Sequence, residues 1–366
     1  MRLPCFDSAR LCERLALAED NLRALEVFSS YLNLCPRYAG VEDVRSLSHE
    51  TGVSLETAYA LLVSTACGLN VDGDSADRSF FQRYIRPAVR CLDAGACRLD
   101  PYYATVRMPS LALEGWRLGY KRLEAGEAFV ADDLRVCPDG REIAQIGFFM
   151  EPFEAPAAYE NGREWMTVTP SEINTMSAHM RMARGRVAVF GLGLGYYPFM
   201  AAQRPQVSAI TIVERSASAI RLFEEYLLPQ FPHREKISIV QDDAFAFVQN
   251  RLSGYDTAYV DLWHDVLDGM EMYLRIKRLE ARWPRTRFLY WIEPSMLAWL
   301  RGMGWQELRQ GEAGPVLEAL GEMSSWEDLM AGLSDAGLRA AAARISLEVT
   351  RQDESRGYAS SARGNE

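Results

Sequence analysis

Five short apolar runs, separated along the chain by segments with helical character, limit the folds open to residues 171–300. The runs are "RVAVFGL", "AITIVER", "KISIVQDD", "YDTAYVDLW" and "RFLYWIEP", and helix-forming segments such as "YYPFMAAQ", "SASAIRLFEEYLLPQF" and "AFAFVQNR" lie between them. Strands that alternate with helices pair in parallel, with helices on both faces of the sheet. The pattern predicts an α/β fold with a Rossmann-like, doubly wound and mostly parallel sheet.

Residues 1–110 show a pattern that is typical of helices. Apolar residues recur at intervals of three and four from Leu11 to Leu32. The segment "VRSLSHETGVSLETAYALLVSTACGLN" then indicates two helices joined at Gly52, and we predict a helical N-terminal domain with a winged-helix or helix-turn-helix-like element. Its second helix offers Glu56 and Thr57 where a DNA-reading helix would carry Arg, Lys, Asn or Gln. Packing or dimerisation is therefore favoured over DNA binding.

Turn signals mark residues 111–170 as a small antiparallel β-hairpin unit. Pro-Asp-Gly at 138–140 and Asn-Gly at 161–162 each separate two strand-like runs. A helix is predicted next, from Pro170 to about Met182, and it leads into the 171–300 domain. Residues 301–366 predict C-terminal helices and a disordered tail.

The charge balance and the cysteines restrict partners and compartment. The net charge is −10, the pI is about 5.2, and no run of Lys or Arg supplies a basic face. This disfavours nucleic acid and favours a small-molecule substrate, including a cationic one, although solubility explains the acidic excess equally well. Seven cysteines without a Cys-x-x-Cys pair indicate reduced thiols in a cytoplasmic protein. No apolar run reaches the roughly 18–20 residues of a membrane span, and the four histidines lack metal-ligand spacing.

Glycines or acids follow all five predicted strands. In an open parallel sheet, ligands bind at the carboxyl ends of the strands, near the point where the strand order reverses. One acid at one strand end would carry little meaning, but five successive strand ends favour a ligand site. The residues concerned are, in chain order, Gly191, Gly193 and Gly195, Glu214, Asp242 and Asp243, Asp261 with Trp263, His264 and Asp265, and Glu293.

The first three of these strand ends together indicate an adenosine site. Glu214 lies 19 residues after Gly195, which is about the separation at which an acid binds both ribose hydroxyls and disfavours a 2′-phosphate. Asp242 or Asp243 is placed to accept from an adenine amino group. The glycines follow Gly-x-Gly-x-Gly, and Tyr196 stands where a dinucleotide fingerprint continues. A ligand without phosphates, such as S-adenosylmethionine, fits this turn better than a pyrophosphate does.

From residue 116 to 295 the sequence resembles the class I S-adenosylmethionine-dependent methyltransferases, and among them the spermidine synthase-like branch. The similar segments are "INTMSAHMRMARGRVAVFGLGLG", "VER", "QDDAFAF" and "YDTAYVDLWHD". The resemblance implies that Glu214 binds ribose, that Asp243 is the adenine acid and that Asp261 is the catalytic acid. It also implies a homodimer as one possible assembly.

Three departures separate this chain from the aminopropyltransferases of that branch. Their glycine-loop aspartate corresponds to Leu194, and the tyrosine of their preceding helix corresponds to Ile173. Their Asp-Ser-Ser-Asp-Pro segment is Asp-Leu-Trp-His-Asp here, starting at Asp261. The resemblance therefore extends to the fold and the nucleoside site, and it does not extend to the polyamine machinery.

The leading hypothesis is an S-adenosylmethionine-dependent methyltransferase for a small, amine-bearing substrate. A methyl group on a sulfonium is already activated, so the protein mainly positions the nucleophile and accepts its proton. Asp261 is the first candidate for this role, His264 is a second base or a capping residue, and Asp265 could hold a cation. Trp263 is either an aromatic wall or a core residue. The alternatives are an aminopropyltransferase that uses decarboxylated S-adenosylmethionine, a ligand-sensing regulator with a helix-turn-helix domain, and a relative that binds without turnover.

Overall fold

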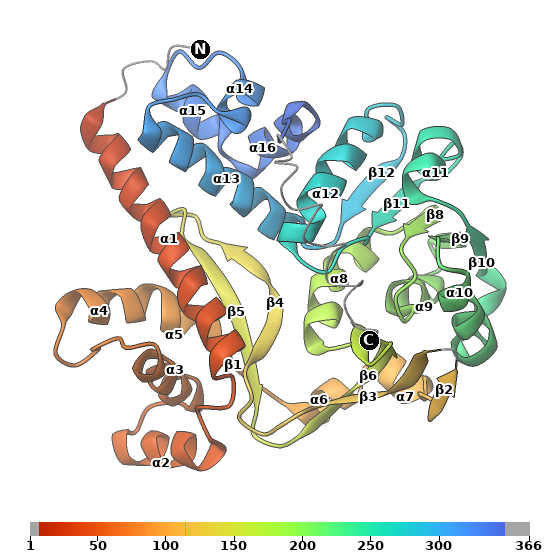
Figure 1. Ribbon diagram of the computed structural model, residues 1–366, viewed down its shortest axis with the longest axis horizontal. Coiled ribbons are helices and arrows are strands. Elements are labelled where there is room, and N and C mark those ends of the chain that lie inside the picture. Colours follow the sequence, from red (N-terminus) through yellow and green to blue (C-terminus); the bar gives the residue numbers. More distant parts are fainter. Residues whose placement is uncertain (1–6, 114, 348–366) are drawn as a thin grey trace, which may run out of the picture.

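The computed structural model describes residues 7–113 and 115–347, and the largest sheet in this part of the chain is a five-stranded parallel sheet, on the right in Figure 1. The strand order is β10-β9-β8-β11-β12, with every neighbouring pair parallel. Its strands are β8 Gly185–Phe190, β9 Val207–Glu214, β10 Ile237–Gln241, β11 Thr257–Val260 and β12 Arg287–Tyr290. The order reverses between β8 and β11, as in a Rossmann-like fold. The predicted mixed α/β architecture with a parallel sheet is confirmed.

Helices flank this sheet. They are α8 Pro170–Met182, α9 Tyr196–Ala202, α10 Ala217–Leu222 continued by a π-helical turn at Phe223–Leu227, α11 Ala244–Asn250, α12 Val266–Glu280 and α13 Glu293–Gln310, with 3₁₀ turns at Leu228–Gln230 and Arg234–Lys236. The central strand β8 is apolar from Val187 to Phe190, and these four residues are at most 1% exposed. A strand buried on both faces needs such a continuous apolar run.

Two further sheets precede the parallel one. The first has the order β1-β5-β4, and the second has the order β2-β3-β6-β7. Their strands are β1 Val89–Leu92, β2 Leu111–Leu113, β3 Trp116–Leu123, β4 Phe129–Val136, β5 Glu142–Phe149, β6 Phe153–Glu160 and β7 Arg163–Thr167. Both predicted turns form, and Asn161 and Gly162 have the positive φ angles, 51° and 80°, that an Asn-Gly hairpin turn requires. The short strand β1 was not predicted, and it pairs in parallel with β5.

Helices dominate the chain up to residue 105. They are α1 Ser8–Leu34, α2 Val41–Thr51, α3 Leu55–Ala66, α4 Ser75–Phe80 with a π-helical turn at Phe81–Ile85, α5 Arg86–Ala88, α6 Ala94–Arg98 and α7 Pro101–Thr105. Gly52 ends α2 in the left-handed conformation and Ser54 caps α3. Tyr59 of α3 stacks on Phe148 of β5 with 4.0 Å between the ring centroids. The helices thus share a core with the mixed sheet β1-β5-β4, and the separate helix-turn-helix-like domain stays a prediction.

The C-terminal part adds helices α14 Pro315–Leu320, α15 Trp326–Gly332 and α16 Asp335–Ala341, followed by a 3₁₀ turn at Ala342–Arg344. Arg301 of α13 joins these helices to the β4–β5 hairpin, because it forms ion pairs with both Glu142 and Asp335. Arg309 of α13 pairs in turn with Glu19 of α1. The predicted disordered tail falls within residues 348–366, outside the described residues.

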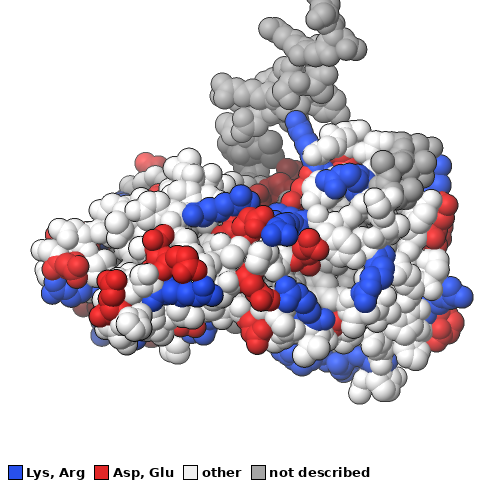
Figure 2. All heavy atoms as spheres, turned by 90° about the horizontal axis from the view of Figure 1, so that it is seen from below, with Lys and Arg blue, Asp and Glu red and all other residues white. Residues whose placement is uncertain are grey.

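Two observations concern the sequence-based expectations about partners. On the face shown in Figure 2, Lys and Arg side chains lie among Asp and Glu side chains. Among the described residues, no helix is both long and apolar enough to cross a membrane.

Candidate functional site

The glycine turn after β8 is held in the left-handed region of backbone space. Gly191, Gly193 and Gly195 have φ angles of 95°, 51° and 76°. A Cβ atom on Gly191 would lie 2.0 Å from the carbonyl oxygen of Asp261, and one on Gly195 would lie 2.4 Å from the ring of Phe223. Packing alone therefore requires glycine at both positions. At Gly193 the nearest atom to such a Cβ, at 3.2 Å, belongs to the flexible side chain of Met166 on β7.

Glu214 ends β9 beside this turn and is half-buried. Its Oε2 accepts a 3.3 Å hydrogen bond from the backbone N–H of Leu192, and its Oε1 accepts a 2.7 Å bond from the N–H of Ser216. The carboxylate thus fixes the glycine turn relative to the start of α10. A carboxylate has about four acceptor positions, so Glu214 has capacity left for ribose hydroxyls.

Asp242 and Asp243 follow β10, whose last residue, Gln241, lies in register with Glu214. Asp243 is exposed and caps α11 by accepting a 2.8 Å bond from the N–H of Ala246 through Oδ1. Asp242 pairs with Arg251 at 3.2 Å. The fold therefore brings all three predicted nucleoside acids to the ends of two adjacent strands. Their binding of ribose and adenine stays a prediction.

Asp261 follows β11 next to the glycine turn, and its backbone N–H donates to the carbonyl oxygen of Phe190. Asp261 lines a cavity of about 20 Å³ together with Glu172, Tyr197 and Tyr259. A cavity of this size holds one group as large as a water molecule. Burial raises the pKa of Asp261 to about 7. Burial, together with the neighbouring Asp261 carboxyl group, raises the pKa of Glu172 well above its usual range.

Glu172 was not among the residues that the sequence predicted for the site. It lies in the first turn of α8, where acids are common because they favour the positive end of a helix. Position alone therefore did not single it out. The packing of α8 against the strand ends brings it to a residue 89 positions further along the chain.

Polar atoms without a hydrogen-bond partner gather around this cavity. The rings of Tyr197 and Tyr259 stack at 3.7 Å, and both hydroxyls are buried with no partner among the described residues. His179 Nδ1 and Trp263 Nε1 are also buried without a partner among the described residues, although neither residue lines the cavity. Burial lowers the pKa of His179 to about 4, so its ring is neutral near pH 7. Buried polar groups without partners are rare in proteins and here indicate a place for a polar ligand.

His264, Asp265 and Trp263 have local structural functions at the start of α12. Asp265 caps this helix and accepts a 2.7 Å bond from the N–H of Leu267, while the exposed His264 bonds to Asp268. Trp263 is 3% exposed, as the core interpretation predicted. The structure does not place His264 or Asp265 on the wall of the Asp261 cavity. Their catalytic roles stay predictions.

Comparison with known proteins adds little to this description. No protein-family model and no curated protein matches the chain. Among solved structures it is similar to the spermidine synthase from Thermotoga maritima, with a TM-score of 0.27 and 13% sequence identity. That likeness covers 41% of this chain and 59% of the synthase chain. At this TM-score we take the Rossmann-like architecture from the strand order and not from the likeness.

Proposed function

We propose that the protein is an S-adenosylmethionine-dependent transferase that methylates a small amine-bearing substrate. The observation that carries the proposal is the pair of carboxyl groups, Glu172 and Asp261, in one cavity beside the glycine turn of a Rossmann-like sheet. Ligands of such sheets bind at the carboxyl ends of the strands, where the strand order reverses. Here that position lies between β8 and β11.

The donor would bind at the ends of β8, β9 and β10. Glu214 would accept from the ribose hydroxyls, and Asp243, or Asp242, from the adenine amino group. The cavity of about 20 Å³ is too small for a nucleoside, so the adenosine would lie outside it, over the glycine turn. Met166 is the nearest side chain to Gly193, and its flexible thioether can move aside. When bound, S-adenosylmethionine supplies a methyl group already activated by the sulfonium.

Asp261 would receive the proton that the amine loses, with the protonated Glu172 beside it. A general base works best when its pKa lies near the operating pH, and the pKa of Asp261 is about 7. Glu172 keeps its proton to higher pH because burial and the adjacent Asp261 disfavour its charged form. The two groups titrate as one coupled pair. The hydroxyl groups of Tyr197 and Tyr259, which have no partner among the described residues, would hydrogen-bond to the substrate nitrogen or to a water molecule beside it.

An aminopropyltransferase that uses decarboxylated S-adenosylmethionine is the second candidate. The two carboxyl groups favour it, because they suit a substrate with several positive charges. Leu194 opposes it. This side chain is 3% exposed, and its carbonyl oxygen is held by the Tyr102 hydroxyl at 2.6 Å. An apolar residue therefore occupies the position of the aspartate in the glycine loop of the aminopropyltransferases.

Ligand-induced thermal stabilisation tests the donor site. The full chain is heated with S-adenosylmethionine, its decarboxylated form, methylthioadenosine or NAD, because a ligand of the native state raises the midpoint by mass action. S-adenosylmethionine should raise it in the wild type and in Glu235→Gln, which alters an exposed acid before β10. The rise should disappear in Glu214→Gln and in Asp243→Asn. Asparagine is chosen at position 243 because it can still cap α11. Stabilisation by NAD alone, or by none of these ligands, would refute the assignment.

A further inference from the structure

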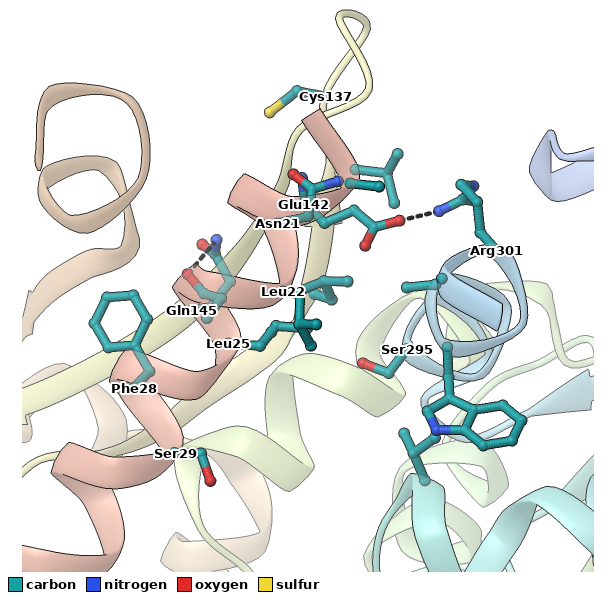
Figure 3. Close-up of a pocket in the computed structure, with 18 of the residues that line it drawn as sticks. Asn21, Leu22, Leu25, Phe28, Ser29, Cys137, Glu142, Gln145, Ser295 and Arg301 are labelled. Carbon is teal, nitrogen blue, oxygen red and sulfur yellow. Dashed lines mark hydrogen bonds and ion pairs between the residues drawn. The ribbon is translucent and has the colours of Figure 1, made fainter. Parts of the chain in front are cut away.

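A groove of about 1510 Å³ lies between α1, the β4–β5 hairpin and α13, and it shares no lining residue with the small cavity at Asp261. Figure 3 shows Asn21, Leu22, Leu25 and Phe28 of α1 on one side, together with Gln145 of the hairpin, and Ser295 and Arg301 of α13 on the other, with Glu142 of the hairpin extending toward Arg301. Three parts of the chain that are distant in sequence form this groove together.

The groove carries an unusual share of exposed apolar side chains. Five of the nine large hydrophobic residues that are exposed in the described part of the chain line it, namely Leu22, Leu25, Val130, Val136 and Leu267. Leu22 is 58% exposed and Leu267 is 80% exposed. A contiguous apolar surface of this kind marks a binding site, whereas scattered exposed leucines do not.

Several of the charged side chains at its walls are paired within the protein, whereas Arg14 and Asp132, which also line the groove, form hydrogen bonds only to backbone groups within the described part of the chain. Arg301 pairs with Glu142 and Asp335. Arg309 pairs with Glu19, and Lys121 pairs with Glu164 at 2.9 Å. Basic side chains that are engaged in this way offer little attraction to an anionic occupant. The lining therefore suits a body that is apolar and uncharged.

One end of the groove reaches the edge of the sheet that carries Asp261. Val266 and Leu267 line it and directly follow the segment from Asp261 to Asp265. Ser295, which also lines it, lies in the first turn of α13 after β12. β12 neighbours β11, with Tyr290 opposite Val260, and neighbouring strands are only about 4.8 Å apart. An occupant of the groove can therefore extend towards the strand ends.

We propose that this groove binds the apolar body of the acceptor, so that the substrate is an amine carrying an extended, uncharged alkyl or aromatic part. The inference rests on the proposed function, because it places the amine of this acceptor at Asp261 and Glu172. The position of the groove at the ligand-binding edge of the sheet favours the acceptor over a second copy of the chain. Association of two copies through this face is an outcome that the test must separate.

Binding of primary alkylamines to the full chain tests this proposal without any turnover. Butylamine, hexylamine and octylamine are titrated at pH 7.5, and the fluorescence of tryptophan is followed, since Trp299 lines the groove. Each added methylene should tighten binding about fourfold. Leu22→Asp should abolish this dependence on chain length. Leu34→Asp is the matched control, because Leu34 lies on the same helix, is 82% exposed and does not line the groove.

The outcomes separate the groove from the donor site. If affinity does not change with chain length while S-adenosylmethionine still stabilises the protein, the groove inference is overturned and the proposed function stands. If affinity depends on chain length but no donor binds, the groove binds apolar amines and the proposed function is overturned. If the alkylamines do not bind and sedimentation shows a dimer that Leu22→Asp dissociates, a second copy occupies the groove and the proposal is wrong. Equal loss of binding in Leu34→Asp would also overturn it.

Discussion

Replacing Asp261 by Asn should make the protein more stable at alkaline pH while it removes the proton acceptor. The pKa of Asp261 is raised to about 7 in the folded protein, whereas an aspartate in an unfolded chain has a pKa of about 3.9. The folded state therefore binds the proton more tightly than the unfolded state. Stability contributed by this group falls as the pH rises from about 4 to about 7, and it levels off above that range.

The pKa difference sets the size of the effect. Each pKa unit is worth about 1.36 kcal/mol, so the difference in proton binding at Asp261 between the folded and unfolded states lowers the free energy of unfolding, relative to acid pH, by about 4 kcal/mol at pH 8 and by about 1.5 kcal/mol at pH 5. Asn has nearly the same shape and no charge. The stability of Asp261→Asn relative to wild type should therefore improve between pH 5 and pH 8 by at most about 2.5 kcal/mol, because Glu172 ionises more readily once the neighbouring Asp261 charge is removed. Because the variant is compared with wild type at each pH and the two comparisons are then subtracted, any pH-independent effect of the amide cancels.

Urea unfolding of both proteins at pH 5 and pH 8 measures this quantity, provided that the transitions are two-state. Glu235→Gln is the control, because Glu235 is an exposed acid outside the cavity. Its stability relative to wild type should not change with pH by more than about 0.5 kcal/mol. If the difference in unfolding free energy between Asp261→Asn and wild type is the same at pH 5 and pH 8, Asp261 does not bind its proton more tightly in the folded protein, and the raised pKa is refuted.

Three further substitutions test other parts of the structure, each by urea unfolding. Gly195→Ala should lower the free energy of unfolding by about 2–4 kcal/mol, because the new side chain both strains the left-handed backbone and clashes with Phe223. Gly311→Ala is the control: Gly311 has a φ of 73° and open space around it, so the loss should be only about 1–2 kcal/mol. Equal losses in the two variants would contradict the packing described for Gly195. Asp265→Ala should cost about 1 kcal/mol through loss of the α12 cap while Asp265→Asn stays near wild type, and a neutral Asp265→Ala would argue against the cap. Arg301→Ala should lower the free energy of unfolding by about 3–5 kcal/mol, because it leaves the buried Glu142 unpaired. Arg309→Ala, at an exposed ion pair, should lower it by less than about 1 kcal/mol. A small effect of Arg301→Ala would show that Glu142 finds water or another partner.

The parallel sheet could be predicted from sequence because its central strands, β8 from Val187 onward and β11, are continuously buried and therefore need short apolar runs. The runs that end at Phe190, Glu214 and Val260 form strands in the structure, and the alternation with helices restricts how such strands pair. Strand β1 escaped prediction because "VRCL" is only four residues long and follows a helical segment. Its pairing with β5 depends on tertiary packing.

The site was less predictable than the sheet. Residues at the strand ends could be identified because parallel strands bring their carboxyl ends to one edge. Glu172 could not, because nothing local distinguishes it from any other acid in a first helical turn. The glycines were interpreted as room for a ligand, but the structure shows that Gly191 and Gly195 are required by the neighbouring backbone and by an aromatic ring. The spacing of the glycines predicts a turn there, but it does not show which neighbouring group a side chain at each position would clash with.

Turnover of the methyl donor distinguishes methyl transfer from aminopropyl transfer and from binding without reaction. The full chain is incubated with S-adenosylmethionine or its decarboxylated form in the presence of octylamine, and the nucleoside products are separated by chromatography. We expect S-adenosylhomocysteine from S-adenosylmethionine, formed at least about 100-fold more slowly by Asp261→Asn. Methylthioadenosine from the decarboxylated donor alone would instead support aminopropyl transfer. Absence of any nucleoside product from either donor, or equal rates in wild type and Asp261→Asn, would contradict the account.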